Sequence, residues 1–242
     1  MCTVTFIPFN QTVYITSNRD EQSNRAPAVS PAVYNLSTGK VLFPRDSAAG
    51  GTWIAVHENS NAVVLLNGAL TAHVPYPPYR KSRGLIVLDL IDSATPYNSF
   101  VVMNLNRIEP FTAIIYDDHR LFECRWNGIE KQIRQLDEER PHMWSSATLY
   151  NAEVSSRRDG WFEEWKANTQ YTDQDSILKF HRFTGDNDPH NDLCMNRNGT
   201  VCTVSITSMA ISEHGAVVQY LDLPQQKNQV SKLPFEKTLA DR

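Results

Sequence analysis

The sequence begins MCTVTFIPFNQTVYITSNRDE (residues 1–21), and this stretch decides the fold. β-branched and aromatic residues dominate residues 3–7 and 12–16, while the residues between them are typical of a turn. We therefore predict a β-hairpin that turns near residues 9–11. Counting back along both strands from that turn places residues 18–20 opposite residues 1–3. Cys2 and the Asn-Arg-Asp sequence are thus expected to meet at the open end of the hairpin.

Most of the remaining chain has the pattern of β-strands, and three stretches have the pattern of helices. Two strand pairs are predicted to be hairpins that turn at Asp117-Asp118 and at residues 213–215, and the last helix is expected to be capped by Thr172 or Asp173. The polar residues 224–242 are expected to wrap the surface as a tail. These elements predict a single α+β domain over residues 1–242, with mixed sheets covered by helices. The predicted strands are residues 39–44, 52–58, 61–68, 100–105, 111–118, 120–127, 143–149, 200–211 and 216–223, and the predicted helices are residues 80–94, 152–168 and 172–185.

The composition excludes several classes of protein. The 23 Lys+Arg against 27 Asp+Glu, with no long basic run, argue against a nucleic-acid partner. No stretch approaches the roughly 20 apolar residues that span a bilayer, and the N-terminus lacks the pattern of a secretory signal. The four cysteines are scattered without a disulfide framework, so we expect free thiols and a cytoplasmic location.

Cys2 carries the most distinctive chemistry in the sequence. If Met1 is removed, Cys2 has a thiol and a free α-amine on one carbon, so it can act as nucleophile and base together. A nearby Arg19 would lower the pKa of the thiol from its ordinary value of about 8.5, and Asp20 would hold the α-amine. The alternative is that Cys2 is a small strand residue and that Arg19 and Asp20 form a surface ion pair.

Two further stretches carry residues that suit a cavity. Gly50-Gly51 allows close approach of another backbone segment, and Arg45 and Asp46 beside it would then line the same cavity. The alternative is that the double glycine marks a bulge or a tight entry to the next strand and that Arg45 and Asp46 pair with each other, and we favour this architectural role. Arg83 either binds an anionic group of a substrate or is a solvated charge at the start of a helix.

Six motifs, in order, give the chain a family resemblance: MCT, SNRDE, FPRD, GGTWIAV, LLNG and KSRG. Together they resemble the NRDE family, which is named after the motif and includes the transport and Golgi organisation protein 2 relatives. The likeness runs from Cys2 to about Leu223. The N-terminus also resembles the choloylglycine hydrolase and penicillin V acylase group of N-terminal-nucleophile hydrolases. This resemblance implies a four-layer αββα sandwich with mostly antiparallel sheets.

The resemblance also implies roles for single residues. Cys2 would attack an amide carbonyl, its own α-amine would carry the proton, and Arg19 and Asp20 would set the charge of the site. Asn67 and Asn151 match loosely the asparagines that flank the acylase site and would donate to the oxyanion. Their alternatives are a turn at the end of a strand for Asn67 and a helix N-cap for Asn151.

Three other residues are expected to bind the substrate: Asn18 of the SNRDE motif, Arg45 and Arg83. The chain departs from the family near its end, where relatives have GTR and this chain has GTVCTVS (residues 199–205). Val201 and Cys202 would make the pocket more apolar, so the substrate of a relative does not carry over to this chain.

We expect no metal and no cofactor. His181, His190, Cys194 and Cys202 lie in one segment, but their spacing fits no structural zinc pattern, and the sequence has no haem-attachment C-x-x-C-H. The resulting prediction is hydrolysis of a non-peptide C–N bond in a small molecule, with Cys2 as nucleophile. The rival prediction is a non-catalytic carrier or trafficking factor that holds a small apolar ligand such as haem in the same cavity.

Overall fold

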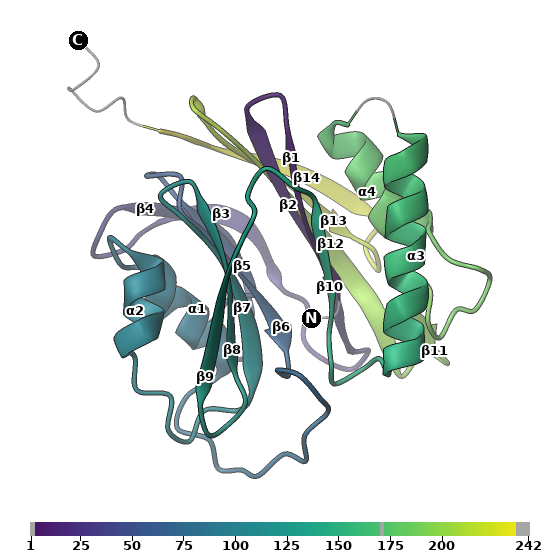
Figure 1. Ribbon diagram of the computed structural model, residues 1–242, viewed down its shortest axis with the longest axis horizontal. Coiled ribbons are helices and arrows are strands. Elements are labelled where there is room, and N and C mark those ends of the chain that lie inside the picture. Colours follow the sequence, from purple (N-terminus) through teal and green to yellow (C-terminus); the bar gives the residue numbers. More distant parts are fainter. Residues whose placement is uncertain (1–2, 170–171, 236–242) are drawn as a thin grey trace.

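Two antiparallel sheets face each other in the computed structural model, which describes residues 3–169 and 172–235 (Figure 1). The first sheet has the strand order β10-β1-β2-β12-β13-β14, with β11 paired to β12. The second sheet runs from β3 to β9 in chain order. The strands of the first sheet are β1 (Thr3–Phe9), β2 (Thr12–Gln22), β10 (His142–Ser145), β11 (Asn196–Arg197), β12 (Val201–Ser212), β13 (Gly215–Asp222) and β14 (Lys227–Pro234). Those of the second are β3 (Val29–Asn35), β4 (Lys40–Arg45), β5 (Ile54–His57), β6 (Ala62–Asn67), β7 (Phe111–Asp117), β8 (Arg120–Trp126) and β9 (Lys131–Leu136).

The main hydrophobic core lies between the two sheets. Val4, Phe6 and Ile15 of the first sheet pack in one cluster with Ile54 and Val64 of the second. Successive side chains of a strand point to opposite faces, so alternate residues of β1 and β2 enter this core. Each sheet therefore buries its inner face against the other.

Four helices cover the outer faces of the sheets (Figure 1). Helices α1 (Arg83–Ile91) and α2 (Pro96–Val102) pack on the second sheet through a separate apolar cluster. Helices α3 (Ala152–Asn168) and α4 (Gln174–Phe183) cover the first sheet. The order of layers is helix, sheet, sheet, helix, so the predicted four-layer αββα sandwich is confirmed. No helix in the described ranges is long and apolar enough to cross a membrane.

The N-terminal hairpin has the predicted register. Thr3 pairs with Asn18 and Phe9 with Thr12, and the turn is formed by Asn10 and Gln11. Both turn residues have positive φ, as a type I′ turn between twisted strands requires. The start of β1 therefore lies beside the SNRDE motif.

Some predicted elements are wrong. Residues 100–105 were expected to be a strand, but Phe100 is buried in α2, whose first residue is Pro96. The pyrrolidine ring suits the first turn of a helix, and this signal outweighs the short apolar run. The expected tail also contains β14, which pairs with β13 along its whole length. Most side chains of this edge strand are exposed, so its sequence lacks the apolar alternation of a buried strand. Residues 236–242 lie outside the described ranges.

Smaller differences concern hairpin turns and unpredicted strands. Asp117 pairs with Arg120, so the turn is at Asp118-His119, one residue later than predicted. Strands β3 and β9 had no prediction, because both have largely exposed side chains and lie at the edges of the second sheet. Helix α3 has the predicted bounds, and Asp173 is the N-cap of α4, in a capping box with Ser176.

Candidate functional site

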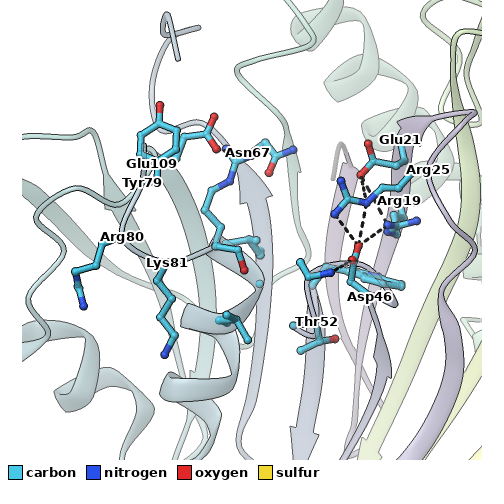
Figure 2. A pocket seen from close by; sticks show the side chains of 18 residues that line it. Arg19, Glu21, Arg25, Asp46, Thr52, Asn67, Tyr79, Arg80, Lys81 and Glu109 are labelled. Atoms are coloured by element: carbon cyan, nitrogen blue, oxygen red, sulfur yellow. Dashed lines mark hydrogen bonds and ion pairs between the residues drawn. The ribbon is translucent and has the colours of Figure 1, made fainter. Parts of the chain in front are cut away.

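A cavity of about 590 Å³ opens beside the end of β2 and the start of α1. Segments from both sheets and from the loops around residues 46–53 and 79–82 form its walls. Figure 2 shows Arg19, Glu21, Arg25 and Asp46 gathered on one side, with Tyr79, Arg80, Lys81 and Glu109 on the other. The lining residues are Arg19, Glu21, Arg25, Asp46, Ala49, Gly51, Thr52, Trp53, Leu65, Asn67, Tyr79, Arg80, Lys81, Ser82, Arg83, Gly84, Leu85 and Glu109.

Two arginines share one carboxylate oxygen in this cavity (Figure 2). Nη2 of Arg19 lies 2.8 Å from Oδ2 of Asp46, and Nε and Nη2 of Arg25 lie 3.1 Å and 3.0 Å from the same atom. Glu21 adds weaker ion pairs, at 3.7 Å to Arg19 and 3.4 Å to Arg25. The Arg19 guanidinium also stacks over the ring of Trp53, 4.7 Å from its centre. Arg19 is therefore a buried, fixed cation at the wall of the cavity.

Asp46 stays ionised because of these contacts. Burial opposes its ionisation, but the Ala49 amide and the guanidinium groups of Arg25 and Arg19 outweigh burial and hold the pKa of the carboxyl below its usual value. Oδ1 accepts the backbone amides of Ala48 and Ala49, at 3.1 Å and 2.8 Å. Asp46 thus belongs to the charged site, whereas its neighbour Arg45 does not line the cavity and donates to the Gly50 carbonyl at 3.2 Å.

Arg83 lies on the opposite wall with its own counter-ion. Its Nη2 is 3.1 Å from Oε2 of Glu109, and its Nη1 donates to the Pro110 carbonyl at 3.2 Å. Oε1 of Glu109 contacts Nε2 of His73 at 3.2 Å. Burial lowers the pKa of Arg83, and Glu109 acts in the opposite direction. Arg83 is thus held in the cavity wall and is not a solvated charge at a helix start.

The β2 strand sends neighbouring motif residues in opposite directions. Arg19 enters the cavity, whereas Asn18 is buried on the helix-covered face. There Asn18 donates to the carbonyl oxygens of His181 and Leu193 at 3.1 Å and 2.6 Å, and its Oδ1 lies 2.6 Å from Nδ1 of His181. This alternation follows from strand geometry and argues against contact between Asn18 and a substrate.

Asp20 is also buried, and its two oxygens are fixed by hydroxyl groups. The Tyr150 hydroxyl donates to Oδ2 at 3.0 Å and the Thr203 hydroxyl to Oδ1 at 2.6 Å. A β-bulge in β12 lies opposite, because Arg19 pairs with Ser205 and Asp20 with Thr203. Such a bulge changes the direction of the side chains near it. The contacts of Asp20 are thus hydrogen bonds to neutral hydroxyl groups, in place of the surface ion pair with Arg19 that was the alternative.

The two asparagines predicted as oxyanion donors lie in different places. Asn67 ends β6 and lines the cavity, and Gly68 after it has a positive φ of 79°. Asn151 is the N-cap of α3, its side chain accepts the Val154 amide at 2.9 Å, and it is absent from the cavity lining. The structure therefore brings Asn67 to the site and leaves Asn151 in a capping role. Cys2 lies outside the described residues.

Val201 and Cys202 were expected to make the pocket apolar, but neither lines the cavity. They pair with Gln22 and Glu21 at the start of β12. Charged residues that the sequence did not single out line it instead, and Arg25, Lys81 and Glu109 are among them. Arg25 follows the SNRDE motif by only a few residues, and Lys81 belongs to the KSRG motif, so proximity to a motif was the only sequence signal.

The structure does not assemble the histidines and cysteines of residues 181–202 into one site. His181 is buried between Thr5 and Asn18, while the ring of His190 contacts the Asn198 side chain at 3.2 Å. Within residues 3–169 and 172–235, no three His, Cys, Asp or Glu side chains are grouped so that they could hold a metal ion.

Comparison with known proteins supports the fold. The chain is similar to a cysteine-to-alanine mutant of conjugated bile acid hydrolase from Clostridium perfringens, with a TM-score of 0.52 and 10% identity over 98% of each chain. An arginine-to-leucine variant of that enzyme gives a TM-score of 0.50 at 9% identity over 99% of this chain and 98% of that one. A Caenorhabditis elegans N-acylethanolamine-hydrolyzing acid amidase ortholog gives 0.55 at 12% identity over 86% of this chain and 92% of that one.

At such low identity these likenesses show the fold alone. A sequence search found no matching curated protein. The family assignment comes from the sequence as a whole and agrees with the six sequence motifs that include SNRDE. The family model of Transport and Golgi organisation 2 matches residues 1–232, and the chain belongs to this family.

Proposed function

We propose that this protein is a cysteine N-terminal-nucleophile hydrolase that cleaves a non-peptide amide bond in a small molecule. The observation that carries the proposal is the pairing of Thr3 with Asn18, one residue before Arg19. Cys2 directly precedes Thr3, and one residue of strand extends only about 3.3 Å. The proposal therefore takes Cys2 to continue the strand by one residue and to act beside Arg19, which lines the cavity.

The reaction begins with removal of Met1, which frees the α-amine of Cys2. This amine takes the thiol proton while Sγ attacks the carbonyl carbon of the amide. The tetrahedral intermediate collapses as the C–N bond breaks, and the α-ammonium gives its proton to the leaving nitrogen. Water then attacks the thioester, which releases the acid and restores the thiol. Water is the only co-reactant.

Three residues support these steps in the proposal. Asp20 favours the protonated form of the α-amine, and the Arg19 cation favours the thiolate. Asn67 is the oxyanion donor that lines the cavity, and loss of such a donor typically costs about 10²- to 10³-fold in rate. The mechanism uses Asn67 and leaves Asn151 out, because Asn151 caps α3 and does not line the cavity.

The lining of the cavity favours a substrate with an anionic group. Five basic side chains line it against three acidic ones, in a protein whose net charge is −4. Arg19 and Arg25 share a single carboxylate oxygen, so their remaining N–H groups suit a carboxylate. N-acyl amino acids combine an amide bond with such a carboxylate and are the first compounds to test.

The test compares the wild type with Cys2→Ser on a panel of N-acyl amino acids and related amides. Serine keeps the size and polarity of the side chain but loses a readily ionised nucleophile. We expect a substrate whose turnover falls at least about 10³-fold in Cys2→Ser, or about 4 kcal/mol in barrier, while binding is retained. Cys202→Ser is the matched control and should keep full turnover.

The rival function predicts a different result. A carrier would turn over no amide on the panel, and an apolar ligand such as haem would bind the wild type and Cys2→Ser equally. That pair of results would remove the hydrolase assignment and leave only the fold.

A further inference from the structure

Tyr150, next to the residue predicted to be an oxyanion donor, contacts the motif carboxylate instead. Its side chain is buried, and its hydroxyl donates to Oδ2 of Asp20 across 130 positions of sequence. A hydrogen bond to an ionised carboxylate is about twice as strong as a neutral one. With the Thr203 hydroxyl on Oδ1, it fixes the orientation of both carboxylate oxygens.

Two cations lie against the ring of Tyr150. The guanidinium carbon of Arg158 is 3.6 Å from the ring centre and that of Arg197 is 5.5 Å away. Arg197 is held by the carbonyl oxygens of Leu149 and His190. A cation over the ring face attracts its π electrons and makes the hydroxyl a stronger donor. The Tyr150 hydroxyl is therefore suited to donate a hydrogen bond to an anion such as the Asp20 carboxylate.

Arg158 joins the same network to the start of β1. It is fully buried, and its Nη1 donates to Oγ1 of Thr3 at 2.7 Å. Its Nε and Nη2 donate to the carbonyl oxygens of Asn191 and Asp192 at 3.0 Å and 2.6 Å. Among the residues that the structure describes, these three acceptors are neutral, although a buried guanidinium is costly without an anion close by. The buried Asp20 carboxylate lies beyond the Tyr150 ring, at its hydroxyl.

We propose that Tyr150 is a positioning residue that fixes the orientation of the Asp20 carboxylate, while Arg158, which lies over the Tyr150 ring, fixes the side chain of Thr3. The proposal rests on the hydrolase function of Cys2. Without this hydrogen bond, Asp20 loses the orientation from which it favours the protonated α-amine. The amine then takes the thiol proton less readily, and the Cys2 thiol reacts more slowly near neutral pH.

A pH measurement at this site must account for the other charged and titratable groups near Asp20. Cys194 is one of them, because burial and the Asp20 carboxylate both raise the pKa of its thiol. Burial and the charge of Arg158 lower the pKa of His181 to about 3, so this histidine stays neutral over the pH range of the test.

The experiment measures the iodoacetamide alkylation rate of Cys2 from pH 5 to 9 by peptide mapping of the full chain. We expect Tyr150→Phe to slow Cys2 about tenfold at pH 7 and to move the half-maximal rate upward by about one pH unit. Tyr116→Phe is the matched control. Tyr116 is equally buried and its hydroxyl contacts Nδ1 of His119 at 3.2 Å on the other sheet, so its loss should leave Cys2 unchanged.

A double-mutant cycle with Asp20→Asn excludes a general loss of structure. In the Asp20→Asn background, Tyr150→Phe should slow Cys2 no further, and the alkylation rate of Cys202 should stay constant in every variant. If Cys2 is alkylated fast, and at the same rate in the wild type and in Tyr150→Phe, the proposed role of Tyr150 is wrong and the hydrolase proposal stands. A Cys2 as slow as the buried Cys124 already in the wild type would overturn both.

Discussion

Gly51 and Gly84 bring two motifs of the sequence into direct backbone contact. A Cβ atom on Gly51 would lie 2.7 Å from the Gly84 carbonyl oxygen, closer than real Cβ contacts allow. The adjacent Thr52 amide donates to the same oxygen at 3.1 Å. This contact packs the loop before β5 against the first turn of α1, and it sets Arg83 across the cavity from Asp46. The close approach expected of Gly50-Gly51 is thus confirmed.

Gly51→Ala should destabilise the protein, because the added methyl group meets backbone atoms that cannot move away cheaply. We expect a loss of about 1–3 kcal/mol in the free energy of unfolding, measured by urea denaturation. Gly160→Ala is the control, since a Cβ there meets nothing within 4 Å and the residue lies inside α3. That substitution should stabilise by about 0.5–1 kcal/mol. Equal effects of the two would contradict the close approach.

Asp46→Asn should lower stability at neutral pH but not in acid. The folded-state pKa of Asp46 lies below its ordinary value of 3.8, so the carboxylate stabilises the folded state above that pH. This contribution is lost as the pH falls through the lower folded pKa. Urea unfolding should therefore separate wild type and variant at pH 7, and the gap should narrow below pH 3.8. Asp137→Asn, in an exposed pair with Arg140, should change little at either pH.

His181 should make the protein less stable as the pH falls below neutral. Burial and the nearby Arg158 lower its folded-state pKa from 6.5 to about 3. Between these values the unfolded chain takes up a proton that the folded protein excludes, so stability falls with decreasing pH. His181→Gln removes this titration, and its stability deficit relative to wild type should shrink from pH 7 to pH 4. The exposed His214→Gln should show no such convergence.

Met1 should be absent from the protein isolated from cells without an N-terminal tag. The side chain of Cys2 is small, and the proposed mechanism needs its free α-amine as base. Intact-mass spectrometry should find the chain lighter by one methionine. Full retention of Met1 on native protein would remove the α-amine mechanism.

Local sequence patterns determined much of the architecture. The β-branched and aromatic residues in 3–7 and 12–16, with the turn between them, predicted the register in which Thr3 pairs with Asn18. The apolar face of residues 152–168 predicted helix α3. These features were predictable because side-chain period, turn preference and capping depend on residues a few positions apart. The family motifs likewise pointed to the sandwich fold through their resemblance alone.

Only the tertiary structure decided which of the motif residues meet. Strand alternation only sends Arg19 to one face of β2 and its neighbours Asn18 and Asp20 to the other. The stacking of the two sheets decided which face borders the cavity, and the distant strand β12 has a β-bulge opposite Arg19 and Asp20. Two charged residues, Arg25 and Glu109, line the cavity, and Tyr150 contacts Asp20. These three residues lie in segments that share no sequence pattern. Contacts over such sequence distances depend on how two sheets stack and how loops close over them, which no local preference encodes.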